Sequence, residues 1–267
     1  MKLIIERWLI KLISDKQGEK LKVTHVFHSG VILETEQDLL VIDYYHDKDS
    51  FDHKDFINYL KQQNHKDFYY FVTHGHEDHF TKDIFSLPYQ SLKGSTRYIL
   101  SEDLANYKNS HPSITLCRPY QEFEVSGLII TTFGSTDKGV SYLIKVKSRD
   151  ILIFHSGDLN WWHWKHFSQD EQLQEKKDFL QEIHKLKTHL TARNLTPDIA
   201  FVPVDPRLEE FYYLAGKAFL EEIQPKKMFP LHFRDDYDVT KKFEEQYAES
   251  ATFERVTRPM ETFILAD

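Results

Sequence analysis

Short apolar runs separated by turn residues dominate the first part of the chain. The runs cover residues 23–28, 31–35 and 39–43, and residues 29–30 and 36–38 interrupt them with small and polar side chains. Runs of this length, rich in β-branched residues and bounded by such breaks, predict strands. We therefore expect an antiparallel meander of three strands.

A strand, helix and strand unit follows the meander. Residues 55–60 have helical spacing, and residues 68–72 form a run of large apolar side chains that predicts a buried strand. Residues 82–92 are expected to form a helix and a loop. Further strands are expected at residues 97–100, at 113–116, 122–125 and 128–133 in a second sheet, and at 142–144, 151–154, 198–204 and 227–231.

Two helices are predicted in the second half. Residues 168–171 have the sequence of a capping box, and a second helix over residues 211–223 ends before Pro225. After the capping box, apolar residues recur at helical spacing. These residues are Leu173, Phe179, Leu180, Ile183, Leu186 and Leu190. We interpret this helix as part of an insertion at about residues 159–195, lying over a site or forming a homo-oligomer contact.

Strands and helices in a chain of 267 residues, with no Pro, Gly or Ser-rich linker, predict one α/β domain over residues 1–267. The formal charge of −8, with acidic and basic residues interspersed, offers no basic stripe for a nucleic-acid backbone. Cys117 is the single cysteine, which excludes an internal disulfide and a thiolate metal site and fits a cytoplasmic protein.

The first residues are apolar but do not have the sequence of a targeting segment. Glu6, Arg7 and Lys11 interrupt residues 1–11 before a signal-peptide core is reached. We expect neither a signal peptide nor a membrane span here. An amphipathic helix or an edge strand that packs on the domain is the expected structure.

Metal-binding residue types concentrate directly after the buried strand at 68–72. Residues 73–80 read Thr-His-Gly-His-Glu-Asp-His-Phe, with three imidazoles and two carboxylates. Side chains two apart at a strand end point the same way, so His74 and His76 can bind one ion as neutral nitrogen donors. Asp78 and His79 follow a turn and can hold a second ion close by. This spacing favours a metal site over a solvated, His-rich loop.

The pattern His-x-His-x-Asp-His after a strand resembles the signature of the metallo-β-lactamase superfamily. The resemblance implies a four-layer αβ/βα sandwich, with two mixed sheets flanked by helices, and a metal-dependent hydrolase. Asp158, in a Gly-Asp turn after a strand, resembles the residue that bridges two ions, and His232 resembles the last ligand. The ligand set that the resemblance implies is His74, His76, Asp78, His79, Asp158 and His232.

The resemblance fails at one ligand position. Where the family has a third histidine for the first ion, this chain has Ser135, whose hydroxyl is a weak donor. Asp137, two residues on, is the candidate substitute. The number of bound ions, one or two, therefore remains open. Zinc is the expected metal, with manganese or iron as alternatives.

Other residues are candidates for supporting roles. The family often has a carboxylate at the place of Asp43 that orients the ligating imidazoles. His28 either lines the pocket, with a metal contact open to it, or is a hydrogen-bonded structural residue. His155 is expected to be structural or to support a ligand.

Two segments are candidates for substrate contact. Trp161 opens an aromatic segment that either walls a pocket or anchors the helix after it. Asp205 and Arg207 form a turn at a strand end, or contact substrate, and Arg207 suits a carboxylate or a phosphate.

These residues predict a hydrolase that acts on a small ester, lactone, amide or phosphodiester through a metal-activated water. Asp78 and Asp158 are the expected catalytic residues, and Asp78 orients the water or accepts its proton. A flavin-partnered di-iron protein of this fold would resemble a pattern with Glu at the place of His76, so His76 favours hydrolysis. A degenerate, non-catalytic metal-binding module is the main alternative because of Ser135, and a nuclease is less favoured on charge.

Overall fold

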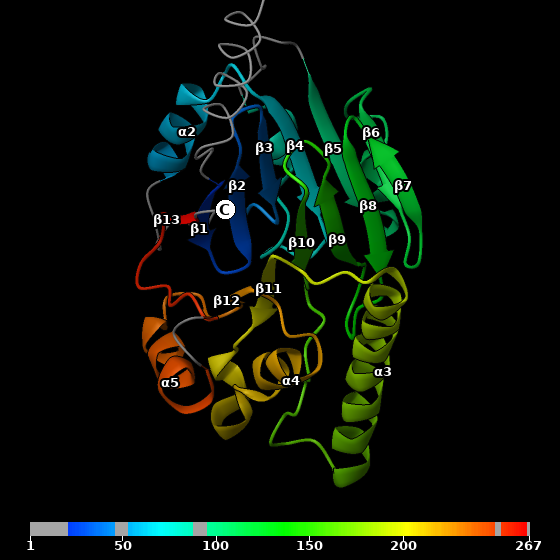
Figure 1. Ribbon diagram of the computed structural model, residues 1–267, viewed down its shortest axis with the longest axis vertical. Coiled ribbons are helices and arrows are strands. Elements are labelled where there is room, and N and C mark those ends of the chain that lie inside the picture. Colours follow the sequence, from blue (N-terminus) through cyan, green and yellow to red (C-terminus); the bar gives the residue numbers. More distant parts are fainter. Residues whose placement is uncertain (1–20, 46–52, 88–94, 249–251, 266–267) are drawn as a thin grey trace, which may run out of the picture.

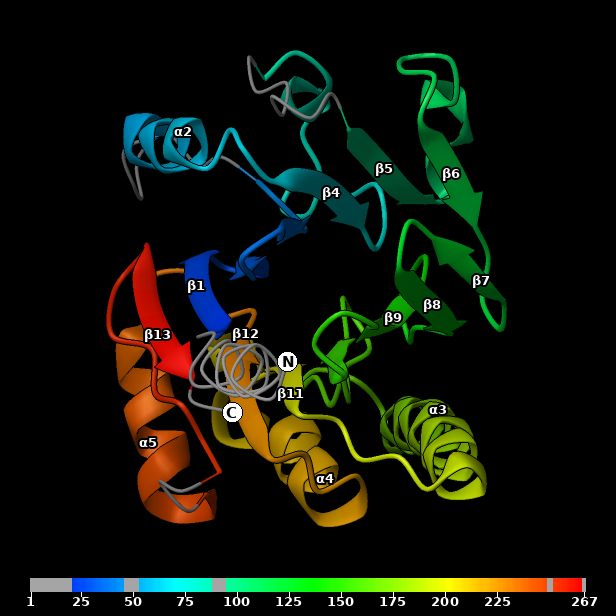
Figure 2. The same ribbon diagram turned by 45° about the horizontal axis from the view of Figure 1, so that its top comes forward.

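The computed structural model describes residues 21–45, 53–87, 95–248 and 252–265. Expectations for residues 1–11, and for residues 88–92 of the predicted helix and loop, lie outside these ranges. Figure 1 shows the chain from one face, and Figure 2 shows two sheets stacked between helices. The predicted α/β sandwich of two mixed sheets flanked by helices is confirmed.

The first sheet has seven strands. They are β1 (Leu21–Phe27), β2 (Gly30–Glu34), β3 (Asp38–Ile42), β4 (Asp67–Val72), β5 (Thr96–Ser101), β6 (Ile114–Cys117) and β13 (Glu261–Leu265). Their order across the sheet is β13-β1-β2-β3-β4-β5-β6. Strands β1 to β3 form the predicted antiparallel meander, and β3 to β6 run parallel.

The second sheet has six strands. They are β7 (Glu122–Val125), β8 (Leu128–Phe133), β9 (Ser141–Val146), β10 (Ile151–His155), β11 (Ile199–Pro203) and β12 (Lys227–Leu231). Their order is β12-β11-β10-β9-β8-β7, with β10, β11 and β12 parallel. The prediction that residues 113–116 belong to this sheet is wrong, because β6 pairs with β5 in the first sheet.

Strand β4 is buried on both faces, as its unbroken apolar run predicts. Phe68 and Tyr70 pack into a cluster with Phe56 and Leu60 of α2 (His53–Gln62), outside the first sheet. Tyr69 and Phe71 point the other way, into the larger cluster between the sheets. The strand that precedes the histidine cluster is thus fixed from both sides.

Helix α3 (Gln169–Arg193) covers the second sheet, together with α4 (Leu214–Glu222) and α5 (Tyr237–Tyr247) (Figure 2). Its capping box at Ser168 is confirmed, with the Ser168 side chain accepting from the backbone of Glu171. Four residues of the predicted stripe, Phe179, Ile183, Leu186 and Leu190, are buried in the core, whereas Leu180 is partly buried and Leu173 is 48% exposed. No helix among the described residues is long and apolar enough to cross a membrane.

Other predicted helices are shorter than expected. Residues 82–85 form a 3₁₀ turn (Lys82–Phe85), and a second such turn covers Glu102–Tyr107. The helix predicted from residue 211 begins at Leu214. Pro206–Phe211 forms a 3₁₀ turn before it, because Asp205 caps that turn through the N–H of Arg207.

Candidate metal centre

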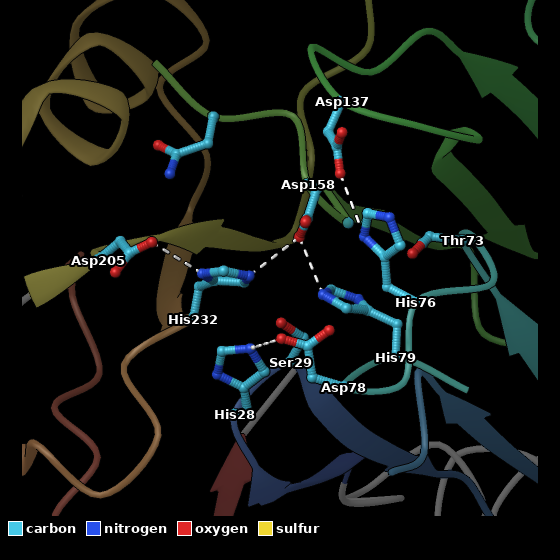
Figure 3. Close-up of polar contacts among 12 residues, drawn as sticks. His28, Ser29, Thr73, His76, Asp78, His79, Asp137, Asp158, Asp205 and His232 are labelled. Atoms are coloured by element: carbon cyan, nitrogen blue, oxygen red, sulfur yellow. Dashed lines mark hydrogen bonds and ion pairs between the residues drawn. The ribbon is translucent and has the colours of Figure 1, made fainter. Parts of the chain in front are cut away.

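Four strands carry candidate ligands to one region between the two sheets. His74 and His76 follow β4, Asp158 follows β10, His232 follows β12 and His28 follows β1. Figure 3 shows the side chains of His28, Asp158 and His232 pointing toward one another from both sheets, with His76 beside them. Residues that are far apart in sequence therefore meet at strand ends, where α/β folds commonly place their sites.

Two glycines allow the loops from the second sheet to approach the His74 segment. Gly139 has a φ of +72°, and a Cβ atom there would lie 1.9 Å from the carbonyl oxygen of Thr73. Gly157 has a φ of +53°, and its Cβ would lie 2.7 Å from that of Thr73. Both positions need a residue without a side chain. This packing brings the loops that carry Asp137 and Asp158 against the segment after β4.

His74, His76, Asp137 and Asp158 form a first group, in which one candidate ligand atom from each residue lies within 4.8 Å of the others. His76 Nδ1 lies 3.2 Å from Asp137 Oδ2, and His74 Nε2 lies 3.6 Å from Asp158 Oδ2. Ser135 is not in the group, and its hydroxyl oxygen accepts from the N–H of Asp137 at 3.2 Å. Asp137 thus stands where the missing histidine was expected.

His28, Asp78, His79 and His232 form a second group with the same spread. His28 is fully buried, and its Nε2 lies 3.3 Å from Asp78 Oδ2. Asp158 Oδ1 lies 2.9 Å from His79 Nε2 and 3.1 Å from His232 Nε2. One oxygen of Asp158 therefore faces the first group and the other faces the second.

A buried carboxylate orients the ring of His79. Asp43 Oδ2 lies 2.9 Å from His79 Nδ1, and Asp43 also accepts from the N–H and the hydroxyl of Thr73 at 2.8 and 2.6 Å. An ionised carboxylate only accepts, so Nδ1–H donates and Nε2 keeps its lone pair. Asp43 has the contacts expected of a residue that orients a ligand.

Asp205 orients the ring of His232 in the same way. This position corrects the expectation that Asp205 contacts the substrate. Its side chain is fully buried, and Oδ2 lies 2.9 Å from His232 Nδ1. Arg207 binds both oxygens of Asp205, with its Nη2 at 2.7 Å from Oδ2. These interactions hold the pKa of Asp205 at about 2, although burial opposes ionisation. Asp205 is thus enclosed behind the imidazole and does not face the pocket.

Several buried atoms at the centre have no hydrogen-bond partner among the described residues. They are both ring nitrogens of His28, Nε2 of His79 and His232, and Oδ1 of Asp158. With Nδ1 of His79 donating to Asp43, its Nε2 points at the Asp158 oxygen, so a cation, either a proton or a metal ion, is needed between these two atoms. The residues present therefore fit a bound metal.

The charges at the centre agree with this fit. Burial lowers the pKa of His79, but the Asp158 and Asp43 carboxylates outweigh burial and raise it to about 10. Burial, aided by neighbouring imidazoles, lowers the pKa of His28 to about 3 and that of His74 to about 4. Although burial opposes it, His232 and His79 hold the pKa of Asp158 well below its ordinary value. The carboxylates therefore stay ionised, and a bound metal would balance their negative charge.

His155 lies beside the centre as a structural residue. Its Nε2–H donates to the carbonyl oxygen of Ser29 at 3.0 Å, and its Nδ1 accepts from the N–H of Gly157 at 3.1 Å. Both nitrogens are therefore used in tying the Gly157 turn to the Ser29 turn, and neither is free to bind a metal.

A pocket of about 350 Å³ opens over the centre. Its lining residues are His76, Asp78, Thr136, Asp137, Asp158, Trp162, Trp164, Glu175, Arg207 and His232. Trp161 is not among them, since it stacks on Phe179 of α3 with ring centroids 5.8 Å apart. The expected substrate contact of Trp161 is corrected: this residue anchors the helix. Trp162 and Trp164 line the pocket instead.

We expect Asp205→Asn to weaken metal binding, because an amide does not fix the His232 tautomer as a carboxylate does. The affinity should fall by about 10- to 100-fold, which is typical of lost partners behind a ligand. Titration with a zinc-sensitive competitor dye measures it. The matched control is Asp198→Asn, which removes a carboxylate that pairs with Lys226 away from the centre. An unchanged affinity in Asp205→Asn would contradict this role.

No known family model matches the sequence, and a search among curated proteins finds no match. Solved structures do match. Igni18, a metallo hydrolase from Ignicoccus hospitalis, superposes with a TM-score of 0.60 at 17% identity, over 92% of this chain and 98% of that one. YhfI from Bacillus subtilis, a metallo-beta-lactamase fold protein, gives 0.57 at 11% identity, over 92% and 100%. CmlA, a diiron beta-hydroxylase from Streptomyces venezuelae, gives 0.53 at 9% identity, over 93% and 54%. At these levels of sequence identity, the structural similarity shows a shared fold.

Proposed function

We propose that this chain, which has the metallo-β-lactamase fold, is a metal-dependent hydrolase of a small ester, lactone, amide or phosphodiester. The observation that carries the proposal is the pair of ligand groups that meet at Asp158 beneath one pocket. The description of Igni18 as a metallo hydrolase supports the same activity. The pocket volume of about 350 Å³ suits a small molecule.

The two groups would hold one ion each. His74, His76 and Asp137 would bind the first, with Asp158 between the two ions. The second would be bound by His28, Asp78, His79 and His232. Imidazole and carboxylate donors without thiolate suit zinc, which we favour, and also manganese and iron. The diiron centre named for CmlA supports iron as the alternative.

Bound ions would lower the pKa of a water and polarise the electrophilic oxygen of the substrate. The protein's own residues prepare the site for this chemistry. Asp43 and Asp205 fix the His79 and His232 rings, so their Nε2 atoms need no reorientation. Trp162 and Trp164 line the pocket with apolar rings.

Asp78 would orient the attacking water. It lines the pocket, and its Oδ2 lies near His28 Nε2 and 3.4 Å from Arg234 Nη2. Burial opposes ionisation, but the neighbouring imidazoles of His28 and His79 lower the pKa of Asp78 below its ordinary value. Asp78 therefore remains a carboxylate that accepts a hydrogen bond from water.

The deciding experiment counts metal per chain, by element, in protein purified without chelator. We expect about two zinc ions, one for each ligand group. We also expect hydrolysis of a panel of nitrophenyl esters, lactones or phosphodiesters that is lost with chelator and restored with zinc. Bound metal without any hydrolysis would favour the non-catalytic module. A protein that takes up no metal on reconstitution would refute the proposal.

A further inference from the structure

The pocket over the metal centre has one cationic side chain, apart from histidines, among the described residues that line it. This is Arg207, which follows β11 and lies beside His232. The same pocket contains Asp78, Asp137 and Asp158, but these belong to the two ligand groups, where bound ions would match their charge. Arg207 would then be the fixed positive charge in the pocket lining that a substrate meets beyond the ions, whereas Arg234 pairs with Asp78 and is not part of that lining.

The guanidinium of Arg207 is held rigidly. Its Nε lies 3.0 and 3.1 Å from the two oxygens of Asp205, and its Nη2 lies 2.7 Å from Oδ2. The group also lies over the rings of Trp162 and Trp164, at 5.8 and 5.6 Å from their centroids. The two rings are themselves stacked, at 3° between planes. Its conformational entropy is therefore lost before any ligand binds, which favours affinity.

One edge of this guanidinium remains open. Nη1 has no hydrogen-bond partner among the described residues, and the side chain is 42% exposed. A purely structural arginine that only neutralises Asp205 would not need to line the pocket. Trp162 packs edge-on against His232 at 5.7 Å, which places the Arg207 and tryptophan unit next to the metal centre.

We propose that Arg207, held by Asp205, Trp162 and Trp164, anchors an oxyanion on the substrate, either a carboxylate or a phosphate, next to the bond that is hydrolysed. The substrate class narrows to small esters, lactones, amides or phosphodiesters that carry an anionic group outside the reacting centre. This step rests on the proposed hydrolase function. A charged hydrogen bond to a preorganised guanidinium is among the stronger polar contacts.

The first test compares an anionic and a neutral substrate on the zinc-loaded protein. We expect mono-4-nitrophenyl succinate to be preferred over 4-nitrophenyl pentanoate, and Arg207→Met to lower the ratio of their kcat/KM values by about 10- to 100-fold. Glu175→Gln removes a negative charge from the same pocket and should keep or raise the ratio. The ratio cancels general damage to the centre. An equal loss for both substrates in Arg207→Met would overturn the proposal and leave Arg207 as a support for Asp205.

The second test does not depend on turnover, so it separates this proposal from the proposed function. Tryptophan fluorescence of the zinc-loaded protein is titrated with succinate, with inorganic phosphate and with neutral succinamide. We expect one anion to bind at least about 10-fold more weakly to Arg207→Met than to the wild type and Glu175→Gln. The anion that binds the wild type more tightly identifies the substrate group as a carboxylate or a phosphate. Binding of neither anion, or equal binding in Arg207→Met, would overturn the anchor even if esters are hydrolysed.

Discussion

Replacing Asp158 with asparagine is expected to empty both ligand groups and to reduce hydrolysis to background. The reason is geometric, since one carboxylate oxygen faces His74 while the other faces His79 and His232. An amide of the same shape carries no charge and offers one oxygen. We expect metal affinity to fall by more than the roughly 100-fold that follows the loss of a residue behind a ligand. Metal content and kcat/KM after dialysis against zinc measure it.

Asp170→Asn is the matched control, because that carboxylate is exposed in the first turn of α3. It should bind metal and hydrolyse substrate as the wild type does. Circular dichroism shows whether Asp158→Asn keeps its fold. A folded Asp158→Asn protein that retains two ions would contradict the assignment of Asp158 as the residue shared by the two groups.

Replacing Asp78 with asparagine should have a more selective effect. Asp78 belongs to the second group only, so the ion at His74 and His76 should remain while the ion at His79 and His232 is weakened. Because the water also loses its carboxylate acceptor, we expect kcat to fall by about 10²- to 10⁴-fold, the usual range for a positioned acid or base. Metal stoichiometry and kcat are measured on the same sample.

The control for this variant is Asp83→Asn, an exposed carboxylate in the 3₁₀ turn that follows the histidine cluster. It should leave both stoichiometry and kcat unchanged. Turnover of Asp78→Asn at the wild-type rate would exclude a role for Asp78 in catalysis. Loss of both ions from this variant would mean that the two groups bind metal cooperatively rather than separately.

We propose that Asp137 takes the place of the third histidine in the first group, so that the group is complete without a ligand at Ser135. The turn through Gly139 is packed so tightly against Thr73 that it presents Asp137, and not Ser135, to His76. The donor set of this group is consequently more acidic than a three-histidine set. We interpret the loop as an alternative way of completing the same kind of site.

The sequence by itself determined the parts that depend on local geometry. An unbroken apolar run predicted β4 as buried on both faces, and the strand-end spacing of His74 and His76 predicted that both would face one ion, because side-chain direction alternates along an extended chain. The capping box likewise set the start of α3 from neighbouring residues alone. The resemblance of the motif to a known family then led to the correct fold.

Only the tertiary structure decided which distant side chains share the site. His28, Asp205 and Trp161 each had two interpretations in the sequence, and the choice depends on how loops from two sheets pack, through contacts such as that of Gly157 with Thr73. Burial turned Asp205 toward His232, and stacking on Phe179 turned Trp161 toward α3. Such orientations are set by the summed packing of segments far apart in sequence, which no local pattern encodes.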